Sequence, residues 1–88
     1  MKSNKGNNFD DFKLVAQTQM SVTPQTKFFD STVEICAQMC SFTDSFICRS
    51  FDFLIDTNTC YLYKENLKDI NFPNVYGIKN ENCSHYSS

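Results

Sequence analysis

The stretch EICAQMCSFTDSFICRSFDF, residues 34–53, contains three cysteines within thirteen positions. The chain has five cysteines in all: Cys36, Cys40, Cys48, Cys60 and Cys83. Such a group can be a metal site, a redox centre or a set of disulfide bridges, and each implies a different class of protein. The positions of the cysteines on helix and strand decide among these interpretations.

The chain is short enough that its core needs support from other bonds. A protein of 88 residues is expected to bury only roughly 60–65% of its unfolded surface, and small domains often add disulfides or a metal. Nine phenylalanines and four tyrosines provide the bulk for an ordered core. We therefore expect one small domain rather than a disordered chain.

The charge balance and hydropathy exclude several partners. A net charge of −2, with eight basic and ten acidic residues and no basic run, argues against nucleic acid, whose affinity depends on neutralised phosphates. No window approaches the roughly 18 apolar residues of a membrane span, so no direct membrane insertion is expected. The N-terminal residues lack the apolar segment of a signal peptide. This fits either a cytosolic protein or an extracellular module without its signal peptide.

The clearest predicted helix begins at Ser31. Residues 31–34, STVE, match a capping box, in which the Ser31 hydroxyl accepts the backbone N–H of Glu34 and the carboxylate reaches back. One helix face then carries Val33, Cys36, Ala37 and Cys40. Three more apolar residues widen this stripe: Ile35, Met39 and Phe42. We expect the helix to end near Ser41 or Phe42.

The rest of the chain is predicted to contain short strands. Their expected positions are residues 9–22 (as one strand or two short ones), 27–29, 46–55, 60–63 and 74–78. Residues 46–55 and 60–63 are predicted to form a hairpin around a compact turn. The expected organisation is a flexible N-terminal linker or tail over residues 1–8, a domain over 9–83 and a polar C-terminal tail over 84–88.

Neither a zinc site nor a redox centre fits the cysteine spacing. Structural zinc takes closely spaced ligand pairs from two loops, whereas Cys36 and Cys40 form a single C-x3-C pair inside a helix. The only histidine, His85, lies in the predicted tail. A thioredoxin-like centre needs C-x2-C at a helix N-terminus, and the sequence has no such motif. We expect no metal and no cofactor.

Disulfide bridges fit the pattern best. Cys36 and Cys40 lie one turn apart on the inward face of the helix, and Cys48 and Cys60 open the two strands of the hairpin. A bridge between Cys36 and Cys40 is awkward because their side chains run parallel. Cys40 lies nearest in sequence to Cys48, which leaves Cys36 for Cys60. Each of the bridges Cys36–Cys60 and Cys40–Cys48 would contribute about 2–4 kcal/mol.

The same residues resemble the PAN/apple domain family. That family's pattern is a helix bearing C-x3-C, a strand bearing C-x-x-F-x-[FY] and a following strand bearing C-x-L. Residues 36–40, the run FICRSFDF at 46–53 and the run CYLY at 60–63 match it, and the resemblance extends over residues 12–78. It implies an α+β fold in which an antiparallel β-sheet of about five strands curls around a single α-helix, with the same two disulfides.

Two features depart from the family pattern. Apple domains carry a third disulfide between their first and last strands, but no cysteine precedes Cys36 here. Cys83 is therefore expected to be unpaired, to bridge between chains, or to pair with a residue outside the given sequence. Strict alternation also places Cys48 and Phe51 on opposite faces of their strand. Either a bulge intervenes, or Phe51 covers the other face of the sheet.

The function implied by the resemblance is recognition of an extracellular protein or glycan ligand. Family members are non-catalytic modules of secreted or cell-surface proteins. The lone His85, in a predicted tail, offers no nucleophile and base pair for catalysis. An alternative is a structural module that mediates oligomerisation of the parent protein, through Cys83.

Candidate contact residues come from loops and exposed aromatic positions. Three loops are candidate contact segments: residues 23–27, 41–45 and 64–74. Five side chains are candidate ligand contacts: Tyr61, Tyr63, Tyr76, Arg49 and Lys64. The tyrosines could instead cap the outer face of the sheet, and the two cations could be solvated or paired locally. Asn82-Cys83-Ser84 is an N-x-S sequon, so Asn82 is a candidate N-glycosylation site.

Overall fold

The computed structural model describes residues 12–67 and 74–88. In chain order the described elements are β1 (Lys13–Val15), β2 (Thr18–Met20), β3 (Thr26–Phe28), α1 (Val33–Phe42), β4 (Ser50–Leu54), β5 (Thr59–Tyr63), β6 (Gly77–Lys79) and β7 (Cys83–Ser87). The predicted linker over residues 1–8 lies outside the described residues, as does most of the predicted contact loop 64–74.

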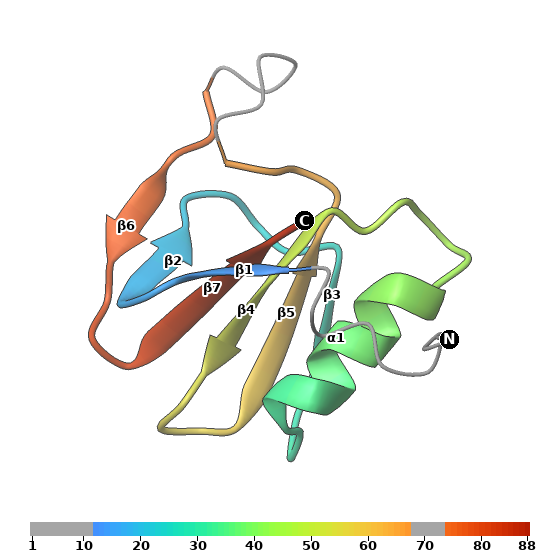
Figure 1. The fold of residues 1–88 in the computed structure, drawn as a ribbon, viewed down its shortest axis with the longest axis horizontal. Coiled ribbons are helices and arrows are strands. Elements are labelled where there is room, and N and C mark those ends of the chain that lie inside the picture. The colour runs from blue at the N-terminus through green and yellow to red at the C-terminus, as the bar shows by residue number, and fades with distance from the viewer. Residues whose placement is uncertain (1–11, 68–73) are drawn as a thin grey trace.

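A five-stranded antiparallel sheet forms the centre of the fold (Figure 1). Its strand order is β1-β7-β4-β5-β3, so β4 pairs with β7 on one side and with β5 on the other. Strands β2 and β6 form a separate antiparallel pair. This arrangement, with one helix among the described residues, confirms the predicted α+β class and the predicted hairpin between β4 and β5.

The two faces of the sheet are covered by different elements. Phe51 of β4 is in register with Leu62 and Tyr86, and this face packs against α1 through Cys36 and Ala37. The core here is apolar, and both Phe51 and Leu62 are fully buried. Because side chains alternate along a strand, the next residue of β4 faces the opposite side, where β2 lies.

The helix begins one residue later than the capping-box motif predicted. Thr32 is the N-cap, and its Oγ1 accepts the backbone N–H of Ile35 at 3.2 Å. Ser31 is buried, and its own N–H donates to the carbonyl of Asn58 in the β4–β5 turn at 2.8 Å. Because Ser31 contacts that turn, it precedes the helix, and the capping function passes to the next hydroxyl residue. The helix ends at Phe42, as expected.

The prediction of a polar tail over residues 84–88 is wrong. Residues Cys83–Ser87 form β7, which lies inside the sheet between β1 and β4. Alternate residues face opposite sides, so Tyr86 stacks on Phe51 while His85 is in register with Asp52. The segment is polar because one of its faces contacts the polar residue Asp52. The composition of the segment alone does not reveal this contact.

The conflict between Cys48 and Phe51 disappears in the structure. Strand β4 begins only at Ser50, so Cys48 precedes the strand and is not subject to its alternation. Phe51 lies on the helix-facing side, within the core cluster that includes Cys60. Strand β4 therefore needs no bulge, and Phe51 does not lie on the other face of the sheet.

Phe51 provides the first test of this fold. Its ring lies 5.0 Å from that of Phe12, edge to face, and 4.8 Å from that of Tyr86 in a stack. We expect Phe51→Ala to lower the free energy of unfolding by about 3–5 kcal/mol, because it removes a fully buried ring and leaves a cavity. Urea unfolding followed by circular dichroism measures this loss.

Phe29→Ala is the matched control, because Phe29 is 71% exposed. It is expected to change the free energy of unfolding by less than about 0.5 kcal/mol. Equal losses in the two variants would contradict the assigned core.

Candidate binding site

A surface groove lies where the end of α1 meets the loop that leads to β4. It encloses about 640 Å³. Its lining residues are Phe12, Cys40, Ser41, Thr43, Asp44, Phe46, Ile47, Cys48 and Ser88. Most of them belong to the helix end and the following loop, so the predicted contact segment 41–45 contributes to the groove. The loop's contribution continues beyond that segment to Cys48.

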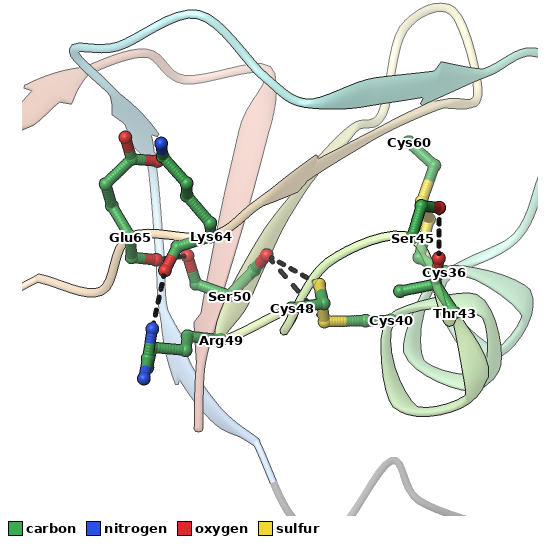
Figure 2. Close-up of a disulfide and its surroundings, with 10 residues drawn as sticks. All are labelled: Cys36, Cys40, Thr43, Ser45, Cys48, Arg49, Ser50, Cys60, Lys64 and Glu65. Carbon is green, nitrogen blue, oxygen red and sulfur yellow. Dashed lines mark hydrogen bonds between the residues drawn. A yellow bond between two sulfur atoms is a disulfide. The ribbon is translucent and has the colours of Figure 1, made fainter.

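Two disulfides hold the framework of this groove. Cys36–Cys60 ties α1 to β5, and Cys40–Cys48 closes the loop between α1 and β4 (Figure 2). This is the pairing that the sequence predicted. The Cα atoms of Cys40 and Cys48 lie 5.1 Å apart, so the loop starts and ends at nearly the same place. At the start of this loop, Thr43 is the C-cap of α1, and its N–H donates to the carbonyl of Met39 in the helix at 3.0 Å.

Hydrogen bonds to backbone carbonyls hold the residues that follow the groove loop. Nη1 of Arg49 donates to the carbonyl of Lys64 at 3.3 Å, and Oγ of Ser50 donates to the carbonyl of Glu65 at 2.6 Å (Figure 2). The N–H of Ser88, a groove residue, donates to the carbonyl of Arg49 at 2.9 Å. Arg49 therefore lies beside the groove and joins two chain segments. The side chain of Lys64 is exposed.

The three candidate tyrosines have different environments. Tyr76 is exposed, and half-buried Tyr61 lies beneath the ammonium of Lys27, whose Nζ is 5.7 Å from the ring centroid. Tyr63 is fully buried, so its prediction as a ligand contact is wrong. Its side chain points to the side of the sheet covered by β2, where its hydroxyl contacts Asp52. The structure does not bring these tyrosines to the groove.

A buried polar network lies on the sheet face opposite the helix. The carboxylate of Asp52 accepts the backbone N–H of Met20 at 2.9 Å and the hydroxyl of Tyr63 at 2.8 Å through Oδ2. Its Oδ1 lies 2.6 Å from Nδ1 of His85. Because a carboxylate only accepts, Nδ1 carries the proton between them. Nε2 of His85 lies 2.8 Å from Oγ of Ser87.

The network joins three strands of the main sheet to β2. Asp52, Tyr63 and His85 are all fully buried, and they come from β4, β5 and β7. Burial, together with the charge and hydrogen bond of Asp52, raises the pKa of Tyr63 above its usual range, so the phenol remains a donor. Sequence reasoning missed this network because it placed His85 in a tail. The alternation of Cys83, His85 and Ser87 with Ser84 and Tyr86 was the available signal.

The hydrogen-bond order Asp52–His85–Ser87 is that of a serine hydrolase triad, but its position does not suit catalysis. Both the imidazole and the carboxylate are fully covered by protein, so a substrate at Ser87 would not reach the base. Ser87 also lies within a paired strand, where its backbone is held by β1 and β4. The network instead satisfies a buried charge and connects strands.

Cys83 is unpaired and fully buried. Burial, and to a lesser degree the charge of Asp52, raise the pKa of its thiol to about 12. An inter-chain disulfide would require this sulfur to reach the surface, so the structure offers no support for oligomerisation through Cys83. The preceding residue, Asn82, is exposed in the turn between β6 and β7.

Comparison with known protein families assigns the chain to a family. The family model described as PAN domain matches residues 8–88, a range that includes β7 and the network residue His85. No curated protein matches the chain. Among residues 12–67 and 74–88, no group of three or more histidine, cysteine or acidic side chains could hold a metal ion. Within the same ranges, no helix has the length and apolar character needed to cross a membrane.

The buried thiol predicts low reactivity of the native protein. Thiolate is the reactive form, and burial raises the pKa of Cys83 to about 12, so the thiol of the folded protein stays protonated at pH 8. We expect iodoacetamide at pH 8 to leave the native protein unmodified and to add one group per chain after unfolding in urea without reductant. Mass spectrometry of the two samples measures this. Rapid labelling of native protein would show that Cys83 is accessible.

The Tyr63–Asp52 hydrogen bond predicts a loss of stability when it is removed. We expect Tyr63→Phe to lower the free energy of unfolding by about 1.5–3 kcal/mol, because it deletes a hydrogen bond to a buried charged group. The exposed Tyr76→Phe is the control and is expected to cost less than about 0.5 kcal/mol. If both variants had the same free energy of unfolding as the wild type, the Tyr63 hydroxyl would not stabilise the buried carboxylate of Asp52.

Proposed function

The chain belongs to the PAN domain family, and from that premise we propose that it is a non-catalytic, extracellular module that binds a protein ligand in the groove at the end of α1. PAN domains are binding modules for protein or carbohydrate within larger proteins. Two disulfides support the extracellular assignment, because such bridges persist in oxidising compartments.

The exposed apolar side chain in the groove is the observation that carries this proposal. Ile47 is 70% exposed, although it lies in a short loop closed at both ends by the Cys40–Cys48 bridge. Phe46 lines the same groove, and the nearby Phe42 at the end of α1 is also exposed. Apolar groups displayed on a fixed frame are typical of protein interfaces, because binding removes them from water without a large ordering cost.

The charges in the groove favour a protein over a sulfated glycan. Asp44 contributes a carboxylate to the groove, and its described lining includes no lysine or arginine. A sulfated polysaccharide would require several cations on one face. The guanidinium of Arg49, beside the groove, is already engaged by the carbonyl of Lys64. We therefore propose a partner that presents an apolar anchor residue.

A peptide library and a glycan array together test the class of ligand. We expect the oxidised domain to select peptides with an aromatic or aliphatic anchor from a phage-displayed library and to bind no sulfated glycan on the array. Substitution Ile47→Asp should weaken the selected peptides at least tenfold, because it places a charge where the anchor packs. Isothermal titration calorimetry of the synthetic peptides measures the change.

Ile55→Asp is the matched control. Ile55 is 53% exposed and lies in the β4–β5 turn, outside the groove. Its substitution is expected to leave peptide affinity within twofold of the wild type. Binding that survives Ile47→Asp, or that is confined to glycans, would overturn the proposal.

A further inference from the structure

The Asn82 sequon is a sequence motif that neither the groove nor the buried network uses. We propose that Asn82 carries an N-linked oligosaccharide, placed beside Ile55 at the end of the sheet remote from the groove. The proposal rests on the extracellular role proposed above, since the modification takes place in the secretory pathway. It does not depend on what the groove binds.

The turn between β6 and β7 presents the side chain of Asn82 to solvent. The Asn82 backbone is held on both sides: its N–H donates to Oδ1 of Asn80 at 2.9 Å, and its carbonyl accepts the N–H of Ile55 at 2.7 Å. The turn is closed by the N–H of Cys83, which donates to the carbonyl of Asn80 at 3.1 Å. The residue itself is exposed, so a bulky substituent on its amide can extend into water without displacing protein.

The middle residue of the sequon does not compete with the modification. A disulfide at Cys83 would fix the chain at the acceptor site, but Cys83 is unpaired and fully buried. Asn82 lies just before β7, Cys83 begins that strand with its side chain inward, and Ser84 follows on the alternate face. The side chain of Cys83 is therefore buried, while the acceptor amide of Asn82 is exposed to solvent.

The chemistry requires a co-substrate of a defined class, a lipid-linked oligosaccharide diphosphate. A carbon–nitrogen bond forms between the anomeric carbon of the first sugar and Nδ2 of Asn82. The bond from that carbon to the diphosphate oxygen breaks, the lipid diphosphate leaves, and Nδ2 loses one proton to a base of the transferase. No oxidant or reductant is involved.

The position of the glycan makes it compatible with binding at the groove. The chain runs along β7 from Asn82 to Ser88, which lines the groove, and six residues of strand span roughly 20 Å. Figure 1 shows the β6–β7 and β4–β5 turns together at one end of the sheet, away from the loop that follows α1. A sugar on Asn82 therefore lies next to exposed Ile55 and can cover it, while the groove remains open.

Expression of the whole chain behind a signal peptide in N-glycosylating eukaryotic cells tests the modification. We expect the secreted protein to shift to lower mass on treatment with peptide-N-glycosidase F, with Asn82 converted to Asp in the tryptic peptide. Asn82→Gln and Ser84→Ala should both abolish the shift, and Ser84→Thr should keep or increase it. Asn58→Gln is the control, because Asn58-Thr59-Cys60 matches only the weaker N-x-C pattern, and it should leave the shift unchanged.

The outcomes separate this proposal from the function of the groove. Wild-type protein that is secreted with an unmodified Asn82 peptide overturns the proposal, even if Ser84→Thr becomes glycosylated. Peptide affinity at the groove should agree within twofold between the glycosylated wild type and Ser84→Ala, and a larger gain on loss of the glycan would contradict its placement. Failure of all peptide binding, with Asn82 occupied, would overturn the groove proposal alone.

The contact with Ile55 has its own measurement. The glycan is expected to raise the Tm of the wild type relative to Ser84→Ala, and to raise it less when Ile55→Ser is present in both proteins. An equal gain in the two backgrounds would show that the sugar does not cover this side chain.

Discussion

The carboxylate of Asp52 imposes the constraint on which the rest of the structure depends. It lies at the centre of the middle strand β4 and is fully covered by protein. A buried charge without partners costs several kcal/mol, which is a large share of the stability of a small domain. The partners come from β2, β5 and β7, through the N–H of Met20, the phenol of Tyr63 and the imidazole of His85. The requirement to satisfy one acceptor thus brings the C-terminal strand into the sheet and attaches β2 to the face that the helix leaves open.

The opposite face of β4 depends on a different kind of stabilisation. There Phe51 is packed among apolar groups, and the bridge Cys36–Cys60 joins the helix directly to β5. Hydrophobic burial is non-directional, so by itself it would permit the helix to slide on the sheet. The bridge fixes its position, and the polar network fixes the strands beneath it. Adjacent residues of one strand therefore stabilise the fold in two ways. Phe51 contributes a buried apolar ring on one face of the sheet, and Asp52 contributes hydrogen bonds on the other.

The helix, the hairpin and both disulfides could be predicted because their signals are local or covalent. The spacing of Cys36 and Cys40 defines one face of a helix. Few disulfide pairings remain possible once Cys48 and Cys60 are placed on the two strands of the predicted hairpin. The last strand was missed, since its polar composition resembles that of a tail, its alternation is a weak signal, and its partner Asp52 lies 33 residues away from His85. The groove was found in part. The loop after α1 was predicted as a contact segment, but Phe12 and Ser88 reach the groove only through the order of strands in the sheet.

The residues that stabilise the fold and those proposed to contact a ligand are physically separate. Phe51, Asp52 and the bridged Cys36 are fully buried, so substitutions there act through cavities or unpaired charge. Ile47 and the other exposed loop groups contribute little to the core, and a change among them is expected to leave stability nearly unaltered. The Cys40–Cys48 bridge makes this separation possible, because it holds the ends of the loop whatever side chains lie between them. A fold arranged in this way can accommodate a change of ligand by exchanging groove residues alone. The proposed function therefore assigns the specificity of this module to the few exposed side chains between the two cysteines.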